Sequence, residues 1–94
     1  MDKIRRKRER LEVIFDILTI IRHHHNSIKP TPLLRYSNLS SQSFSEYMDE
    51  LLEKGFVKEI NDGNGKKFLT LTDKGFKYIE KYKTILGFIE EFEL

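Results

Sequence analysis

Apolar residues recur at every third or fourth position near the start of the chain, the spacing that places side chains on one side of a helix. This stripe consists of Leu11, Ile14, Phe15, Leu18 and Ile21. Asp2 has the side chain of a helix N-cap, so the pattern predicts a helix from there to the histidine run at 23–25. The apolar face is continuous only from Leu11 onward. We therefore expect the second part of this helix to pack in a core and the first part to project from it.

Two further helices are predicted, separated by a short turn. Thr31 is expected to cap a short helix that begins at Pro32, where the missing N–H of proline costs nothing. Asn38 suits the turn that follows, because its short side chain tolerates positive φ. An amphipathic helix is then expected from Ser40, a candidate N-cap, to a terminating glycine at Gly55. The expected inner face of this helix consists of Phe44, Tyr47, Met48, Leu51 and Leu52.

The next two apolar runs are typical of strands. They cover residues 56–60 and 67–71 and are joined by Asp62-Gly63-Asn64-Gly65, a sequence rich in residues that tolerate positive φ. Residues 27–29 could form a small additional strand beside this hairpin. The order of elements predicts an α+β fold, a winged helix-turn-helix with a three-helix core and a β-hairpin wing.

A long last helix is predicted from residue 73 to residue 94, beginning after Thr72. It carries more apolar residues than a domain of this size is expected to cover, so we predict a homodimer in which this helix packs against its copy. The predicted dimer interface consists of Phe76, Ile79, Tyr82, Leu86, Ile89 and Phe92. The chain then divides into a winged-helix domain with a basic N-terminal helix extension (1–72) and a dimerisation helix (73–94). Folding of this helix back onto its own domain is the alternative.

Basic residues are concentrated at the front of the chain. Residues 1–35 hold nine Lys/Arg against four Asp/Glu, whereas residues 36–94 hold eight against eleven. A winged helix presents one helix to the major groove and its hairpin to the DNA backbone, so the pattern predicts binding of double-stranded DNA. The predicted DNA contacts are Arg5, Arg6, Arg8, Arg35, Ser41, Gln42, Ser43, Ser45, Lys66 and Lys67.

The helix expected to enter the groove is more acidic than a strong DNA reader. It has no arginine to read guanine, so we expect modest sequence specificity. Its carboxylates, which phosphates repel, are Glu46, Asp49, Glu50 and Glu53. Arg5 and Arg8 also stand four positions before Glu9 and Glu12 and could simply form ion pairs on a solvated helix. The alternative function is therefore a winged-helix module that binds another protein and not DNA.

Other function classes lack the residues that they need. The chain has no cysteine, no Ser/His/Asp spacing, no Gly-rich phosphate loop and no HExxH motif, so we predict neither a catalytic function nor a cofactor. His23, His24 and His25 would point about 100° apart on a helix, which is poor geometry for one ion, so no metal is predicted. Metal binding or pH sensing by this run is the alternative. No apolar run reaches the ~18 residues of a membrane span, and the expected location is the cytoplasm, in association with the nucleoid.

Several segments together resemble a known family, the small archaeal winged-helix DNA-binding proteins that dimerise through a C-terminal antiparallel coiled coil. The resemblance covers most of the chain and lies in residues 11–18, residues 38–40, Phe44 with Tyr47, residues 51–57 and residues 71–75. It implies a homodimer that binds double-stranded DNA as a transcriptional regulator or as an architectural protein associated with chromatin. The last helix is shorter than the usual arm of that family, and the helix expected in the groove is less basic.

Overall fold

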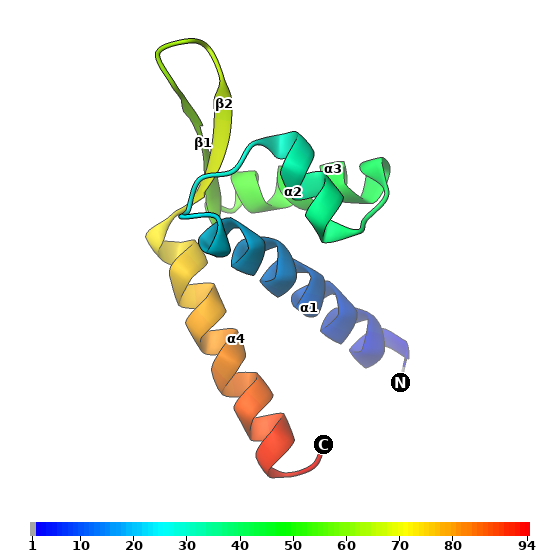
Figure 1. Ribbon diagram of the computed structural model, residues 1–94. Coiled ribbons are helices and arrows are strands. Elements are labelled where there is room, and N and C mark those ends of the chain that lie inside the picture. The colour runs from blue at the N-terminus through cyan, green and yellow to red at the C-terminus, as the bar shows by residue number, and fades with distance from the viewer. Residues whose placement is uncertain (1) are drawn as a thin grey trace.

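The computed structural model describes the backbone of residues 2–94 and the side chains from residue 9 onward. Its elements in chain order are α1 (Asp2–His23), α2 (Pro30–Ser37), α3 (Ser41–Glu53), β1 (Val57–Asn61), β2 (Lys67–Leu71) and α4 (Asp73–Glu91). In Figure 1 the hairpin rises from a body formed by α2, α3 and the end of α1, while α1 and α4 diverge from that body. The order confirms the predicted winged helix-turn-helix fold with a C-terminal helix. Of the helices in residues 2–94, none combines the length and apolar character needed to cross a membrane.

A single apolar core connects all of these elements. Its buried side chains come from the four helices, from both strands and from the connection between α1 and α2: Ile14, Ile17, Leu18, Ile21, Ile28, Leu33, Phe44, Met48, Leu51, Val57, Leu69, Leu71 and Ile79. Ile17 is fully buried although the predicted stripe of α1 did not include it. The core covers the inner face of α3, and the opposite face of that helix remains exposed to solvent.

The ends of α3 are fixed by the residues that the sequence predicted. The Ser40 hydroxyl accepts a hydrogen bond from the N–H of Ser43 at 3.1 Å. At the other end Gly55 has a φ of +77°, which a glycine adopts without strain, and its N–H bonds the carbonyl of Leu52. The N–H of Phe56 bonds the carbonyl of Leu51, which completes a Schellman motif. Both ends of the helix are therefore set by local sequence.

The start of α2 differs from the prediction. The helix begins at Pro30 with Lys29 as N-cap, whereas Thr31 was expected to cap a helix starting at Pro32. Two prolines stand two residues apart, and both fit the first turn, where no intrahelical N–H bond is lost. The earlier proline opens the helix, so Thr31 lies inside it. The predicted turn at Asn38 is confirmed by its φ of +58°.

The wing is a two-stranded antiparallel hairpin in which Val57 pairs with Leu71 and Asn61 with Lys67. Ile28 adds one antiparallel bridge to Leu69, so the predicted small strand at residues 27–29 is reduced to a single residue pair. The carboxylate of Asp62 closes the turn, because its Oδ1 accepts from the N–H of Asn64 and of Lys66 at 2.8 and 2.9 Å.

α4 is divided into a packed first half and an exposed second half. In the first half Ile79 is fully buried in the core of its own chain, so its assignment to a dimer interface is wrong. Tyr78 is half-buried and donates its hydroxyl hydrogen to the carbonyl of Leu11 at 2.7 Å, and the Tyr82 ring lies 4.7 Å from that of Phe15. In the last third of the helix and the residues beyond it, Ile89 is partly buried, and the other large apolar side chains are exposed: Ile85, Leu86, Phe88, Phe92 and Leu94.

Candidate nucleic-acid interface

The outer face of α3 presents a row of small polar side chains. Phe44 and Met48 anchor the helix to the core from the opposite face. Ser41, Gln42 and Ser45, three of the predicted DNA contacts, are exposed in the first two turns. Hydroxyl and amide groups can donate to and accept from base edges and phosphates, so this end of the helix is equipped for polar recognition.

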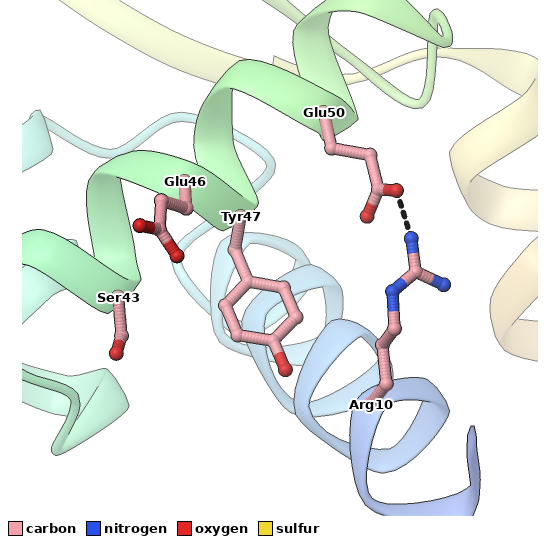
Figure 2. Close-up of a pocket in the computed structure, with 5 residues that line it drawn as sticks. All are labelled: Arg10, Ser43, Glu46, Tyr47 and Glu50. Atoms are coloured by element: carbon pink, nitrogen blue, oxygen red, sulfur yellow. Dashed lines mark hydrogen bonds and ion pairs between the residues drawn. The ribbon is translucent and has the colours of Figure 1, made fainter. Parts of the chain in front are cut away.

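The face of α3 that points toward α1 borders a polar cavity of about 420 Å³. Figure 2 shows the residues that line it: Arg10, Ser43, Glu46, Tyr47 and Glu50. Ser43 therefore borders this cavity and does not lie on the outermost face of the helix. The Tyr47 ring points toward α1 (Figure 2). Because the cavity contains both a guanidinium and carboxylates, it has no single dominant charge.

Glu50 is the one carboxylate on α3 for which residues 9–94 supply ion-pair partners. Its Oε2 accepts hydrogen bonds from the guanidinium of Arg10, on α1, and from the ammonium of Lys54 at 3.0 Å (Figure 2 shows the Arg10 pair). The other carboxylates of the helix are exposed and have no ion-pair partner in the described part of the chain: Glu46, Asp49 and Glu53. The acidic character of α3 is therefore partly neutralised near its C-terminal end and not near its N-terminal end.

The sequence indicated only half of this ion-pair cluster. Lys54 stands four positions after Glu50, the spacing at which helical side chains meet. Arg10 lies forty residues earlier, and no local pattern connects it to α3. The pairing depends on how α1 and α3 cross, which only the folded chain determines.

The wing carries the other predicted contacts. Lys66 and Lys67 are exposed at its tip, and within residues 9–94 neither forms an ion pair. Such unpaired ammonium groups at the end of a projecting hairpin can approach backbone phosphates. Between α3 and the base of the wing lies a groove of about 210 Å³ whose rim includes Ser45, Asp49 and Glu59.

The remaining predicted DNA contacts are basic residues of α1 and α2. The side chains of Arg5, Arg6 and Arg8 lie outside the described residues. Arg35 is exposed in the last turn of α2, where its cation also complements the end of the helix dipole.

The histidine run ends α1 and connects it to α2. The Nδ1–H of His24 donates to the carbonyl of Ile20 at 2.8 Å, and the His24 ring packs on Tyr36 at 4.9 Å between centroids. Asn26, in the left-handed conformation, accepts a hydrogen bond from the N–H of Leu71 at 2.7 Å. Among the described residues no three His, Cys, Asp or Glu side chains are grouped to hold a metal ion. These contacts give the segment a structural role at the base of the wing.

Comparisons with known proteins agree with this architecture. Residues 7–90 match the protein family described as winged helix-turn-helix. The uncharacterized protein MJ0287 of Methanocaldococcus jannaschii is 42% identical over 73 residues, which amount to 78% of this chain and 68% of that protein.

Two solved structures extend the comparison. A MarR variant from E. coli complexed with operator DNA is similar with a TM-score of 0.68 and 25% identity, over 79% of this chain and 54% of that chain. Sso10a-2, a DNA-binding protein from Sulfolobus solfataricus, is similar with a TM-score of 0.70 and 20% identity, over 88% of this chain and 83% of that chain. The chain thus spans about half the length of MarR and most of the length of Sso10a-2.

Proposed function

Since the chain belongs to the winged helix-turn-helix family, we propose that it binds double-stranded DNA, as a transcriptional regulator or a chromatin-associated architectural protein. One observation carries the proposal: α3 is held by its buried face while its polar N-terminal turns remain uncovered. The unpaired lysines at the wing tip support it, and so does the similarity to MarR bound to operator DNA and to Sso10a-2. The proposal includes no catalytic step and no cofactor, and it places the protein with the nucleoid in the cytoplasm.

We expect modest sequence specificity. α3 has no Lys or Arg from Ser41 to Glu53, so the bidentate arginine–guanine contact is absent. Affinity should then come largely from phosphate contacts by the wing and by the basic N-terminal part of α1, including Arg5, Arg6 and Arg8.

A homodimer completes the proposal. At the end of α4, Phe88 is 55% exposed and Phe92, the residue after the helix, is 58% exposed; their rings lie 4.8 Å apart, and Ile85 is about half-exposed one turn earlier. An apolar surface of this kind marks an interaction site. The predicted residues Leu86, Ile89 and Phe92 belong to this surface, and Phe76 and Tyr82 lie nearer the body of the domain.

The charges of α4 favour an antiparallel partner. Its first part carries four lysines, Lys74, Lys77, Lys81 and Lys83, against Asp73 and Glu80, whereas residues 84–94 contain three glutamates and no Lys or Arg. Antiparallel packing of two copies through their second halves brings the acidic end of each helix beside Lys81 and Lys83 of the other, and parallel packing brings the acidic ends together. We therefore propose a two-fold antiparallel dimer through the second half of α4.

A gel-shift series with unrelated duplexes over a range of salt concentrations tests DNA binding. We expect affinity to fall steeply with salt, because binding to phosphates releases counterions. Replacing Lys66 or Lys67 by Ala should weaken binding to all duplexes alike and flatten the logarithmic salt slope by up to about one unit each, or two together. Lys77→Ala, which removes one exposed lysine from α4, is the matched control and should leave the slope unchanged.

The second candidate function is binding of another protein, which the exposed carboxylates of α3 favour. Absence of any shifted duplex at low salt would reject DNA binding and leave this candidate. A salt slope that stays the same in the double lysine variant would instead remove the wing from the interface.

A further inference from the structure

The carboxylates of α3 differ in whether they form ion pairs. Glu50 is neutralised by Arg10 and Lys54, but Glu46, one turn closer to the N-terminus, is exposed and has no ion-pair partner among residues 9–94. A bare carboxylate beside DNA phosphates lowers affinity, since like charges repel at short range. Glu46 therefore weakens DNA binding unless it gains a specific contact there.

Glu46 lies on the part of α3 that the proposed function brings to the bases. It follows Gln42 by four residues and lies opposite Phe44 and Met48, at the edge where the outer face of α3 meets the cavity toward α1. Four residues of helix correspond to about 6 Å along the axis, which is about two base-pair steps. The two side chains can therefore address neighbouring base pairs in one major groove.

Two groups in the major groove donate hydrogen bonds, the 4-amino group of cytosine and the 6-amino group of adenine, but the adenine group lies beside the N7 acceptor, which repels a carboxylate. The 4-amino group of cytosine donates a hydrogen bond there, and a carboxylate only accepts; the edges of guanine present acceptors to the same position. A glutamine side chain, with one donor and one acceptor, matches adenine instead. The pair Gln42 and Glu46 thus has the chemistry to read adenine and cytosine close together.

We propose that Glu46 is a specificity-determining residue of α3, accepting a hydrogen bond from the 4-amino group of a cytosine, with Gln42 pairing to an adenine within about two base pairs. This inference rests on the proposed DNA binding and adds the base preference to it. Asp49 is a weaker candidate, because its shorter side chain lies one turn further along and lines the groove against the wing.

The test is a binding selection from a randomised duplex library with the wild-type chain, followed by affinity measurements on the selected duplex and its single-base variants. We expect one position at which cytosine is preferred by about five- to tenfold. Glu46→Gln keeps the shape of the side chain but removes the charge, and it should shift the preference at that position from cytosine to adenine. Glu53→Gln removes the same charge from the same outer face about 10 Å further along the helix and should leave the preference unchanged.

The outcomes separate this inference from the proposed function. If the wild-type chain shifts no duplex, DNA binding itself is rejected. If it binds duplexes but prefers no base, and Glu46→Gln raises affinity for all of them equally, Glu46 only repels phosphates and the inference is wrong while DNA binding stands. A change of base preference by Glu53→Gln as large as that by Glu46→Gln would likewise overturn it.

Discussion

The two halves of α4 belong to one unbroken helix but have opposite surroundings. In the first half Ile79 is fully buried, and Tyr78 and Tyr82 pack on the Phe56 and Phe15 rings. In the second half Phe88, as apolar as any of these, is 55% exposed. The difference shows that apolar spacing along a helix indicates that a surface will be covered but not what covers it. The first half is covered by its own domain, and we propose that the second half is covered by another copy.

The surroundings of the two glycines of α4 differ in the same way. A Cβ placed on Gly75 would stand 2.3 Å from the carbonyl oxygen of Phe56, which is backbone and cannot move aside cheaply. A Cβ placed on Gly87 would meet nothing within 4 Å. The first glycine lets the helix approach the start of the wing closely, and the second has no such contact with the part of the chain that the structure describes.

The largest expected effect comes from making the second half polar. Leu86→Glu together with Ile89→Glu should split the dimer, because the charges would be buried in the interface. DNA affinity should fall by about 10²- to 10⁴-fold, since two weak modules would lose their shared effective concentration. Sedimentation analysis measures the first effect and gel shifts the second.

The matched control for that variant is Thr84→Glu together with Gly87→Glu, which adds the same two charges on the opposite side of the helix. It should remain dimeric. A wild-type chain that sediments as a monomer at concentrations on the order of tens of micromolar would contradict the proposed dimer. The exposed half of α4 would then need a different partner.

The second expected effect concerns the packed half. Gly75→Ala should lower the free energy of unfolding by about 1 to 3 kcal/mol, because the added methyl group overlaps the Phe56 carbonyl and forces the helix away from the wing. Gly87→Ala should raise it by about 0.5 to 1 kcal/mol through helix propensity alone. Denaturant unfolding of the two variants compares them directly. Equal effects of the two substitutions would show that the close contact at Gly75 is not maintained in solution.

Local sequence predicts those features whose interactions connect residues close together in the chain. Helices begin or end as predicted at Ser40 and Thr72, whose hydroxyls accept from N–H groups three positions ahead, and at Gly55, which has a positive φ. The hydrogen bond that the Thr72 hydroxyl also donates to the distant carbonyl of Gly55 was not predicted. Where two neighbouring residues could serve the same purpose, as at Pro30 and Pro32, the pattern did not decide between them. Local sequence thus predicted which helices and strands form more accurately than the residue at which each begins.

The site was less predictable because its key contacts join distant segments. The polar row on α3 followed from helical periodicity, but the pairing of Arg10 with Glu50 depends on the crossing of α1 and α3. Ile79 was misassigned for the same reason: the spacing that would suit a coiled coil also suits a helix packed on its own core. Periodicity identifies the face and not the partner.

A smaller effect is expected from the contact that joins the packed half of α4 to α1. Tyr78→Phe removes the hydroxyl that donates to the Leu11 carbonyl and should lower the free energy of unfolding by about 1 kcal/mol. Tyr36→Phe is the control, because the Tyr36 side chain is 56% exposed and its hydroxyl has no hydrogen-bond partner among the described residues. A loss as large in the control as in the Tyr78 variant would show that the buried contact contributes nothing of its own.

The smallest expected effect is a dependence of stability on alkaline pH. Burial raises the pKa of Tyr78 from 10.0 to about 12, the nearby Tyr82 adds to the shift, and Arg10 opposes it. The folded chain thus keeps this proton at a pH where the unfolded chain has lost it, so the stabilisation is complete below pH 10 and is lost as the pH rises toward 12. Because Tyr78 is only half-buried, solvent screening reduces the size of this loss. Denaturant unfolding across this range should show a decline that is shallower in Tyr78→Phe than in Tyr36→Phe. The same slope in both variants would mean that burial in the packed half of α4 does not raise the pKa of Tyr78.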